Sequence, residues 1–335
     1  MAIKITSASV DVTYQCNLQC KHCFNRSGDL SPDYFEKVMT KEELRRILID
    51  LAHLHLSSLC FCGGETLLEY EFIKEILPLL KEISPKTSFN MVSNGLLFSK
   101  KKAIELKNDG LNMIQFSLDG FSNYSYDYIR GTRNGVKRVK KAIEYAIEVG
   151  IQTGVAILPH KRNLSEIDDM IEYLIQAKVY DIRLQPFMPI GRGLDNFEEI
   201  KLTEDDYDYL KFLLLKWDKK LPMLNVSTRV QWGDPLDHFF LLQDTEALPY
   251  ISVNAYGEVM LSPYLPFVLW NLKEKSLEEY LIDKIDKKAL SLGLVKETLN
   301  KIISVEDLSL KGFDLPNIYR EDNIRLDKMV MGEVR

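Results

Sequence analysis

Short apolar runs alternate with amphipathic helical patterns over the first two thirds of the chain. Thr40 and Glu43 form a T-x-x-E capping box, and the apolar residues that follow them fall on one helical face. Six strand–helix units in strict alternation predict an α/β fold with a parallel sheet and right-handed crossovers. The predicted strands span residues 7–14, 57–62, 89–93, 113–118, 151–158 and 181–186, and the predicted helices span residues 40–54, 71–83, 100–108, 136–149, 165–177 and 203–217.

The alternation stops near residue 221. A hairpin pattern follows at residues 250–262, with a turn at residues 255–258, and helical patterns run from residue 276 to about 299. We therefore predict two domains, a barrel-forming core over residues 1–220 and a smaller α+β module over residues 221–335.

Glycine and polar residues are concentrated where the predicted strands end. Three cysteines follow the first strand, Gly63-Gly64-Glu65 follows the second, and polar segments that begin at Ser93 and Ser117 follow the third and fourth. The carboxyl ends of parallel strands meet at one edge of a sheet, which is where ligands bind in α/β proteins. The sequence therefore predicts a functional site at this edge.

The composition narrows the class of protein. Hydrophobic residues make up 46% and charged residues 27% of the 335 residues, which is typical of a globular chain. The net charge of −6 disfavours a nucleic-acid partner, since such proteins normally carry a basic patch. No apolar stretch approaches a membrane span and no secretion signal precedes the first strand, so we expect a cytoplasmic protein that does not bind a membrane.

Cys16, Cys20 and Cys23 have the spacing C-x3-C-x2-C on one predicted loop. A closed zinc site needs four ligands, and a [4Fe–4S] cluster usually takes four cysteines. Three thiolates would leave one iron open to a small molecule, which suits catalysis. The alternatives are a zinc site completed by His22 or another ligand and an incidental grouping of thiols, and the spacing disfavours both.

This motif after the first strand resembles the signature of the radical S-adenosylmethionine (radical SAM) superfamily, and the resemblance covers about residues 7–195. It implies a [4Fe–4S] cluster held by the three cysteines, with SAM bound to the open iron. Cleavage of SAM would yield a 5′-deoxyadenosyl radical that abstracts hydrogen from a substrate. The fold that the resemblance implies is a partial (β/α)6 TIM-type barrel, which agrees with the six predicted units.

The resemblance also implies residues that bind SAM. Gly63-Gly64-Glu65 resembles the family's GGE motif, which contacts the SAM amino group, although Thr66 replaces the usual proline. Two glycines would let the backbone approach the ligand, and a carboxylate can pair with an ammonium group. The segments at Ser93-Asn94 and at Ser117 to Asp119 resemble further SAM-binding segments of the family.

Two residues have alternative interpretations. Arg130 is expected to bind the SAM carboxylate, or else to be a solvated arginine at a helix end. His22 occupies a position where the family often has an aromatic residue near adenine, or else it is exposed.

The remainder of the chain resembles the SPASM/Twitch branch, in the segment 187–193 and in residues 250–281. That branch usually carries auxiliary-cluster cysteines in its C-terminal extension. Here Ser262 stands where one would be expected, and no cysteine occurs after Cys62. Since a hydroxyl is a poor iron ligand compared with a thiolate, we predict one cluster and a degenerate C-terminal module.

Four residues are candidates for substrate chemistry. Cys60 and Cys62 share a face of the second strand, and one could donate hydrogen to a substrate radical, although buried packing is the preferred interpretation. Asp234 or His238 could act as a base in a substrate pocket, or else belong to a hydrogen-bonded loop.

Three functions are consistent with these residues, and the net charge of −6 disfavours a fourth, RNA modification. The leading hypothesis is hydrogen abstraction from a peptide during ribosomal peptide maturation. The alternatives are modification of a small molecule, such as a sugar, nucleoside or amino acid derivative, and a non-enzymatic iron–sulfur scaffold or electron carrier. The expected partners are the substrate, a flavodoxin- or ferredoxin-type electron donor and, since the cysteine loop begins at residue 16, a separate leader-peptide-binding protein.

Overall fold

The computed structural model describes residues 4–332, in which the strands form one sheet. Strands β1 to β7 are neighbours in chain order and all of them pair in parallel. This arrangement confirms the predicted parallel α/β fold. The parallel strands are β1 (Ser7–Asp11), β2 (Ser58–Cys62), β3 (Ser88–Ser93), β4 (Met113–Ser117), β5 (Gln152–Ile157), β6 (Asp181–Leu184) and β7 (Arg229–Trp232).

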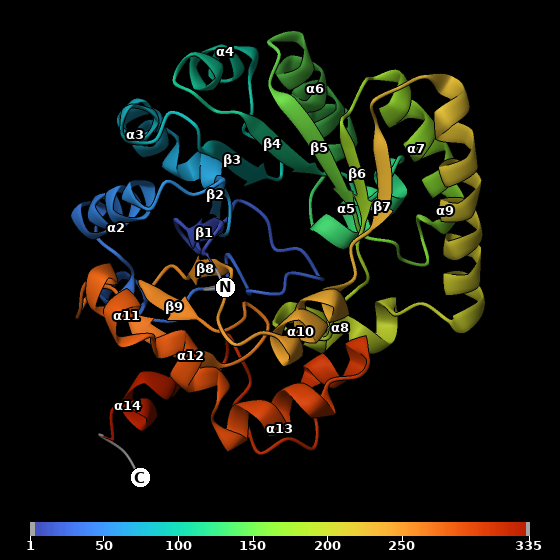
Figure 1. The fold of residues 1–335 in the computed structure, drawn as a ribbon. Helices are drawn as coiled ribbons and strands as arrows, with labels where there is room; N and C mark the ends of the chain where they lie inside the picture. The colour runs from blue at the N-terminus through green and yellow to red at the C-terminus, as the bar shows by residue number, and fades with distance from the viewer. Residues whose placement is uncertain (1–3, 333–335) are drawn as a thin grey trace.

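Helices cover the outer face of this arc of strands (Figure 1). The predicted capping box begins α2, because the Thr40 hydroxyl accepts a hydrogen bond from the Glu43 amide and the Glu43 carboxylate accepts one from the Thr40 amide. The helices and 3-10 turns of this part are α1 (Tyr34–Lys37), α2 (Lys41–His53), η1 (Thr66–Glu69), α3 (Tyr70–Ile83), α4 (Lys100–Asn108), α5 (Asn123–Arg130), α6 (Gly135–Glu148), η2 (Leu164–Glu166), α7 (Ile167–Gln176), α8 (Arg192–Ile200) and α9 (Glu204–Leu224).

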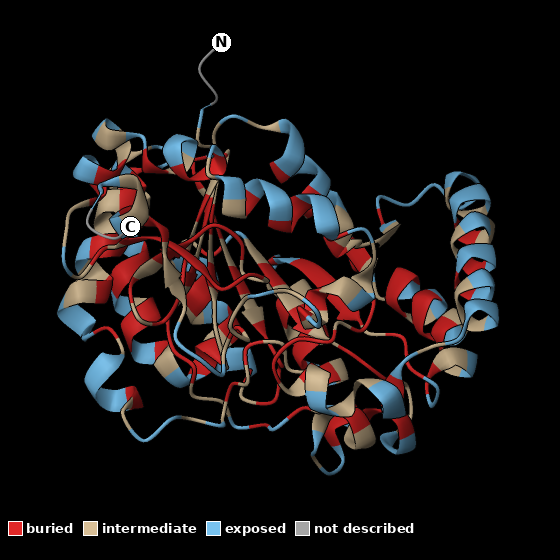
Figure 2. Ribbon diagram, turned by 90° about the horizontal axis from the view of Figure 1, so that it is seen from below, coloured by how far each residue is buried: buried red, intermediate tan, exposed pale blue. Residues whose placement is uncertain are grey.

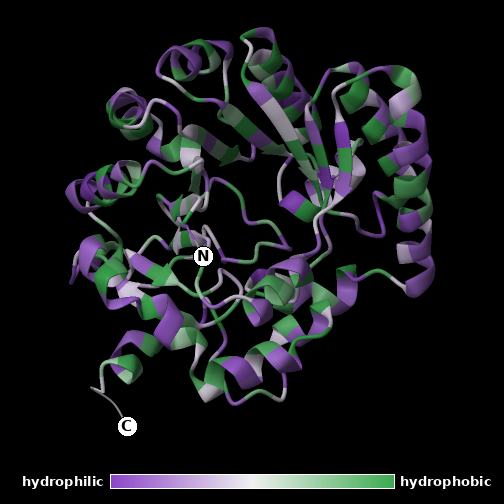
Figure 3. Ribbon diagram, viewed as in Figure 1, coloured by the Kyte–Doolittle hydropathy of each residue, from purple (hydrophilic) through white to green (hydrophobic). Residues whose placement is uncertain are grey.

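The core lies between the sheet and these helices. Alternate residues of β1 to β4 are buried, and the apolar faces of the helices pack onto them (Figure 2). Hydrophilic residues occupy the opposite helix faces (Figure 3). On the inner side of the arc the alternate strand positions carry polar groups, among them Asp11, Cys60 and Cys62, which are partly buried. The sheet therefore presents a polar concave face to the centre of the molecule.

The C-terminal extension continues the same sheet from the other side of β1. Strand β8 pairs in parallel with β1, and β9 and β10 follow as antiparallel strands, so the predicted hairpin is confirmed. The predicted helical region after residue 276 is divided into three helices, and Lys284 ends the first of them in a left-handed conformation. The elements are α10 (Pro235–Asp244), β8 (Tyr250–Val253), β9 (Glu258–Met260), β10 (Phe267–Asn271), α11 (Leu277–Asp283), α12 (Ile285–Leu290), α13 (Gly293–Lys301), η3 (Val305–Ser309), β11 (Ile324–Arg325) and α14 (Leu326–Val330).

Strand β7 was not predicted from the sequence. It is only four residues long, and it pairs with β6 after the long helix α9. The sheet therefore crosses the predicted boundary at residue 220, and the division into residues 1–220 and 221–335 stays a prediction. None of the helices within residues 4–332 has the length and apolar character needed to cross a membrane.

Candidate functional site

The three clustered cysteines lie on the segment between β1 and α1, residues 12–33, which we call the cysteine loop. Cys20 is buried, and Cys16 and Cys23 are half-buried. The loop folds back on itself because the Gly28 amide donates to the Tyr14 carbonyl at 2.9 Å and the Cys23 amide donates to the Cys20 carbonyl at 3.3 Å. It starts at the carboxyl end of β1, where the sequence places it.

Each of the three sulfur atoms has a polar neighbour. The side-chain nitrogen Nδ2 of Asn94 lies 4.0 Å from the Cys16 sulfur, and an Arg130 guanidinium nitrogen lies 3.6 Å from the Cys20 sulfur. The Cys23 thiol donates to the side-chain oxygen of Asn25 at 3.1 Å. Burial raises the pKa of the Cys20 thiol to about 12, although Arg130 opposes that rise. A bound metal cation would offset this rise and favour the thiolate form.

This donor set fits an iron–sulfur cluster. Within residues 4–332 no three His, Cys, Asp or Glu side chains are grouped as a single metal ion would require. A [4Fe–4S] cluster makes a different demand, since each cysteine binds its own iron. The three neighbouring thiols on one loop, with N–H donors beside two of them, meet that demand.

The two glycines after β2 allow close backbone packing against the cysteine loop. Gly63 has φ +126°, and a Cβ there would lie 2.3 Å from the Thr13 carbonyl oxygen. A Cβ at Gly64 would lie 2.2 Å from the Gln15 carbonyl oxygen. The Gly64 amide donates to Thr13 at 2.7 Å. Besides letting the backbone approach a ligand, these glycines therefore let the end of β2 pack directly against the cysteine loop.

Glu65 is fully buried and joins two of the predicted segments. Its carboxylate accepts hydrogen bonds from the Ser93 hydroxyl at 2.7 Å, the Asn94 amide at 2.8 Å and the Leu67 amide at 3.0 Å. Burial raises the pKa of this carboxyl, although these hydrogen bonds oppose the rise. A carboxylate has about four acceptor sites, so one is left for a further donor. Asn94 also donates to the Asn17 side chain at 2.8 Å, which ties the segment to the cysteine loop.

Asp119 and Arg130 form a buried ion pair beside Cys20. Their side chains are 2% and 11% exposed, which rules out a solvated position for Arg130. Burial opposes the charge on Asp119, but the Arg130 guanidinium outweighs it and lowers the pKa of the carboxyl. The second Asp119 oxygen accepts from the Leu158 amide at 2.7 Å. The pair therefore fixes the guanidinium against the Cys20 sulfur.

His22 lies in the same buried region. Its Nε2 is 3.6 Å from the Asp119 carboxylate, and its Nδ1 is buried without a hydrogen-bond partner among the described residues. Burial, with Arg130 adding to the effect, lowers the pKa of the imidazole to about 3, so the ring is neutral. Ser117 ends β4 at the same edge of the sheet and is half-buried. The predicted cysteine, GGE, Ser93, Ser117 and Asp119 segments therefore end at one edge.

Gly191 and Arg192 hold the cysteine loop from α8, a role that the sequence argument missed. The Arg192 guanidinium donates to the carbonyl oxygens of Cys20 at 3.0 Å, Arg26 at 3.1 Å and Ser27 at 2.6 Å. Its amide donates to the Cys23 carbonyl at 2.9 Å. Gly191 has φ +59°, and a Cβ there would lie 2.0 Å from the Phe24 carbonyl oxygen. The G-R-G segment in the sequence was the available signal.

Asp11 is a second functional candidate that the sequence argument missed. It pairs in register with Cys62 on the concave face of the sheet, and the Cys62 sulfur lies 3.5 Å from the Cys60 sulfur. Burial raises the pKa of Asp11 to about 7, with the nearby Tyr14 hydroxyl opposing that rise. A carboxyl group within a predicted strand of otherwise uncharged residues was the available signal. Asp11 can hold or accept a proton near neutral pH.

Asp234 and His238 have other surroundings. Asp234 caps α10, because its carboxylate accepts from the Leu236 amide at 2.9 Å, and it lines a separate pocket with Trp232. His238 Nε2 lies 2.9 Å from the buried Ser262 hydroxyl and 3.3 Å from the Tyr250 hydroxyl. Burial lowers the pKa of His238 to about 4. Neither residue hydrogen-bonds to the residues around the three cysteines.

Comparisons with known proteins agree with this geometry. Residues 10–174 match the family model of the Radical SAM superfamily. The sporulation killing factor maturation protein SkfB of Bacillus subtilis is 26% identical over 231 residues, which are 69% of this chain and 51% of SkfB. The GTP 3′,8-cyclase of Peptoclostridium acidaminophilum is 31% identical over 201 residues, which are 57% of this chain and 58% of the cyclase. The chain thus spans little more than half the length of these relatives.

Solved structures share the fold. SuiB of Streptococcus suis, bound to S-adenosylmethionine, has a TM-score of 0.69 at 17% identity over 91% of this chain and 76% of SuiB. The protein anSMEcpe, with bound AdoMet, has a TM-score of 0.65 at 17% identity over 98% of this chain and 95% of anSMEcpe. The likeness to anSMEcpe therefore includes the C-terminal extension as well as the barrel.

Proposed function

The chain belongs to the radical SAM superfamily through residues 10–174, and from this premise we propose that it removes a hydrogen atom from a peptide substrate. The observation that carries the proposal is the cysteine loop, where side-chain N–H groups of Asn94 and Arg130 point at two of the three neighbouring thiols. When bound, one [4Fe–4S] cluster and SAM would together supply the 5′-deoxyadenosyl radical that this reaction needs.

The residues around the loop have the chemistry to hold both groups. Cys16, Cys20 and Cys23 would bind three irons. Arg130 has five N–H donors, and its contacts with Asp119 and the Cys20 sulfur leave donors for the SAM carboxylate.

The SAM amino group and adenine would meet two further residues. Glu65 keeps an acceptor site for the amino group. The neutral His22 ring, with its unpartnered Nδ1, can accept a hydrogen bond from the adenine amine or stack on the base. Ser117 ends β4 at the same edge, where its hydroxyl would reach SAM.

Two observations favour a peptide as the substrate. The solved structures that share this fold include SuiB bound to the precursor peptide SuiA and anSMEcpe bound to the Cp18Cys peptide. The extension after residue 221 is included in the likeness to anSMEcpe, which spans 98% of this chain. Because no cysteine follows Cys62, the extension would act without an auxiliary cluster.

A small-molecule substrate is the second candidate. It is favoured by the 31% identity to a GTP 3′,8-cyclase, which exceeds the identity to SkfB. That match covers 57% of this chain. The two candidates share the same SAM chemistry and differ in what enters the concave face of the sheet.

The test is anaerobic reconstitution followed by iron and sulfide counts and a dithionite assay for 5′-deoxyadenosine, with Cys20→Ala as the control. We expect about four irons per chain and product from the unmodified protein alone. The assay is then repeated with a library of unstructured decapeptides and with GTP. Stimulation by peptides supports the proposal, and stimulation by GTP alone supports the second candidate. A fully loaded protein that makes no 5′-deoxyadenosine would refute both.

A further inference from the structure

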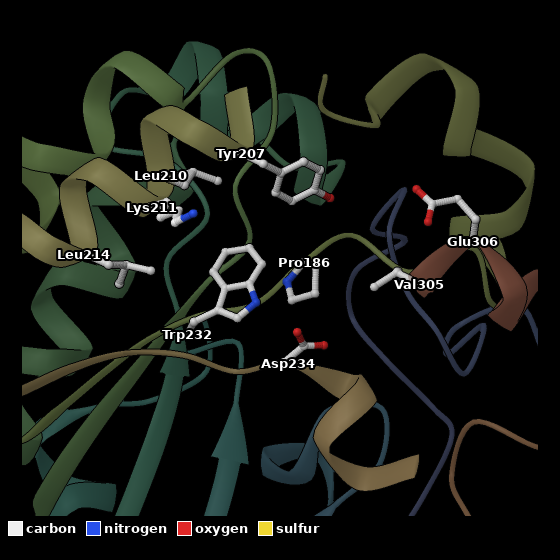
Figure 4. Close-up of a pocket in the computed structure, with 9 residues that line it drawn as sticks. All are labelled: Pro186, Tyr207, Leu210, Lys211, Leu214, Trp232, Asp234, Val305 and Glu306. Carbon is white, nitrogen blue, oxygen red and sulfur yellow. The ribbon is translucent and has the colours of Figure 1, made fainter. Parts of the chain in front are cut away.

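A pocket of about 450 Å³ lies beside the last strand of the parallel sheet (Figure 4), and none of the residues described above around the three cysteines lines it. Its walls come from four elements that are distant in sequence: the end of β6, the helix α9, the end of β7 and the turn η3 of the C-terminal extension. The lining residues are Pro186, Tyr207, Leu210, Lys211, Leu214, Trp232, Asp234, Val305 and Glu306.

The walls are aromatic and apolar. The Tyr207 and Trp232 rings meet edge to face, with centroids 6.1 Å apart and planes at 83°. Leu210 and Leu214 add an aliphatic surface along α9, and Pro186 lies opposite them (Figure 4). Such a surface accepts the methylene stem of a long side chain or the face of a planar cation.

Two carboxylates border these walls. Burial, with the negative charges of Glu306 and then Asp234 adding to it, raises the pKa of Tyr207, so both carboxylates lie near that phenol. Neither makes an ion pair with any residue between 4 and 332. One carboxylate oxygen of Asp234 accepts a hydrogen bond from the Leu236 amide of α10. The exposed Lys211 on α9 also lines the pocket, and within the same residues it too forms no ion pair.

We propose that this pocket binds a lysine or arginine side chain of the peptide substrate. The aromatic rings would hold the cation or its stem, and the Asp234 and Glu306 carboxylates would neutralise the charge. The proposal rests on the peptide function proposed above. Pro186 and Asp234 follow the carboxyl ends of β6 and β7, which share an edge with the cysteine loop after β1. A peptide anchored here would therefore run along the edge that carries the cysteines.

Trp232 provides a direct readout of binding. The chain has three tryptophans, and Trp217 and Trp270 are each 1% exposed, so both serve as internal controls. The reconstituted protein is labelled with 5-fluorotryptophan, and Trp232→Phe assigns the third ¹⁹F NMR signal. The probes are the capped tripeptides Ala-Lys-Ala and Ala-Arg-Ala, with the uncharged Ala-norleucine-Ala as the matched control.

We expect the lysine or arginine probe to shift the Trp232 signal saturably, with an affinity at least about tenfold above that of the norleucine probe. Glu306→Gln, at an exposed position, should weaken binding of the charged probe and leave the norleucine probe unchanged. Asp234→Asn should do the same, because asparagine still caps α10. Higher salt should weaken the binding of the charged probes and leave the binding of the norleucine probe unchanged.

Equal affinity for norleucine, or no Trp232 shift up to the solubility of the probes, would overturn the proposal. Its failure is distinguishable from failure of the proposed function. If 5′-deoxyadenosine forms but Trp232 does not respond, the pocket assignment alone is wrong. If Trp232 responds but no 5′-deoxyadenosine forms from loaded protein, the proposed function is wrong.

Discussion

The Arg192 guanidinium donates a hydrogen bond to the carbonyl oxygen of Cys20, which precedes it by 172 positions in the chain. Two further bonds from the same side chain reach the carbonyls of Arg26 and Ser27. A residue at the start of α8 therefore fixes the backbone of the loop on which the cluster ligands lie. Loss of this contact should affect cluster binding before it affects the barrel.

We predict that Arg192→Ala lowers the iron content after reconstitution and accelerates cluster loss under a chelator. Three carbonyl groups lose a charged donor, and hydrogen bonds to charged groups contribute about 1.5–3 kcal/mol each. Lys201→Ala, at the exposed end of the same helix, is the matched control and should leave the iron content unchanged. Equal iron retention in Arg192→Ala and the control would show that the loop needs no support from α8.

The buried pair of Asp119 and Arg130 gives a second prediction. Arg130→Met leaves the Asp119 carboxylate buried without its partner, and removing one member of such a pair costs about 3–5 kcal/mol. The double variant Asp119→Asn with Arg130→Met should recover part of that loss in thermal unfolding. Cluster content should stay low in both, because neither retains the guanidinium at the Cys20 sulfur.

The two readouts separate two roles of this pair. A double variant as unstable as Arg130→Met would mean that the cost comes from lost packing and not from an unpaired charge. Full cluster content in either variant would mean that Arg130 does not support the thiolate.

Asp11 gives a prediction on pH dependence. Burial raises the pKa of this carboxyl from 3.8 to about 7, so the folded state holds a proton that the unfolded state releases. The stability contributed by the protonated group is complete below pH 4 and is lost as the pH rises to 7. Asp11→Asn should therefore gain stability relative to the unmodified protein between pH 5 and pH 8, by up to about 4 kcal/mol.

The measurement is the melting temperature of both reconstituted proteins at pH 5, 6, 7 and 8. Ser9→Ala, two residues earlier on the same inward face of β1, is the control and should show no such trend. If the melting temperatures of Asp11→Asn and the unmodified protein differ by the same amount at every pH in this range, Asp11 ionises normally in the folded state.

The sequence was sufficient to predict the features that depend on local order. Alternation of strands and helices implied the parallel sheet, and the carboxyl ends of those strands placed the Cys16, Gly63 and Asp119 segments at one edge. Contacts between distant segments could not be derived in that way. The bonds from Arg192 to the cysteine loop and the pocket between Tyr207 and Trp232 depend on how α8, α9 and β7 pack, which no local pattern encodes.

Residue roles also depended on tertiary surroundings. The sequence alone leaves two interpretations of Arg130, a residue that binds the SAM carboxylate or a solvated residue at a helix end. Only its packing against Asp119 shows that it is buried. The sequence places Asp11 in a strand, but alternation alone does not reveal that Cys62 lies beside it on the neighbouring strand. The glycines of the GGE motif were explained by ligand approach, whereas their backbone contacts with Thr13 and Gln15 give a second reason.

The last prediction concerns Cys60 and Cys62, the two cysteines outside the cysteine loop. Their sulfur atoms are 3.5 Å apart on β2, and a hydrogen bond with Cys60 together with burial raises the pKa of the Cys62 thiol. Two thiols are too few ligands for a second cluster, because a [4Fe–4S] cluster usually takes four cysteines. The double variant Cys60→Ser with Cys62→Ser should therefore retain about four irons per chain. Cys23→Ser, which alters the cysteine loop, should lose iron.

The same double variant tests whether Cys60 or Cys62 takes part in substrate chemistry. If the Cys60 and Cys62 thiols serve only packing, the double variant should form 5′-deoxyadenosine at a rate within about twofold of the unmodified protein, which corresponds to about 0.4 kcal/mol. It should also yield the same modified peptide. A normal rate with a changed product would assign one of these thiols to hydrogen donation, because the abstraction step would then be intact and the later step lost. A fall in iron content would instead place them among the cluster ligands, against the arrangement of the cysteine loop.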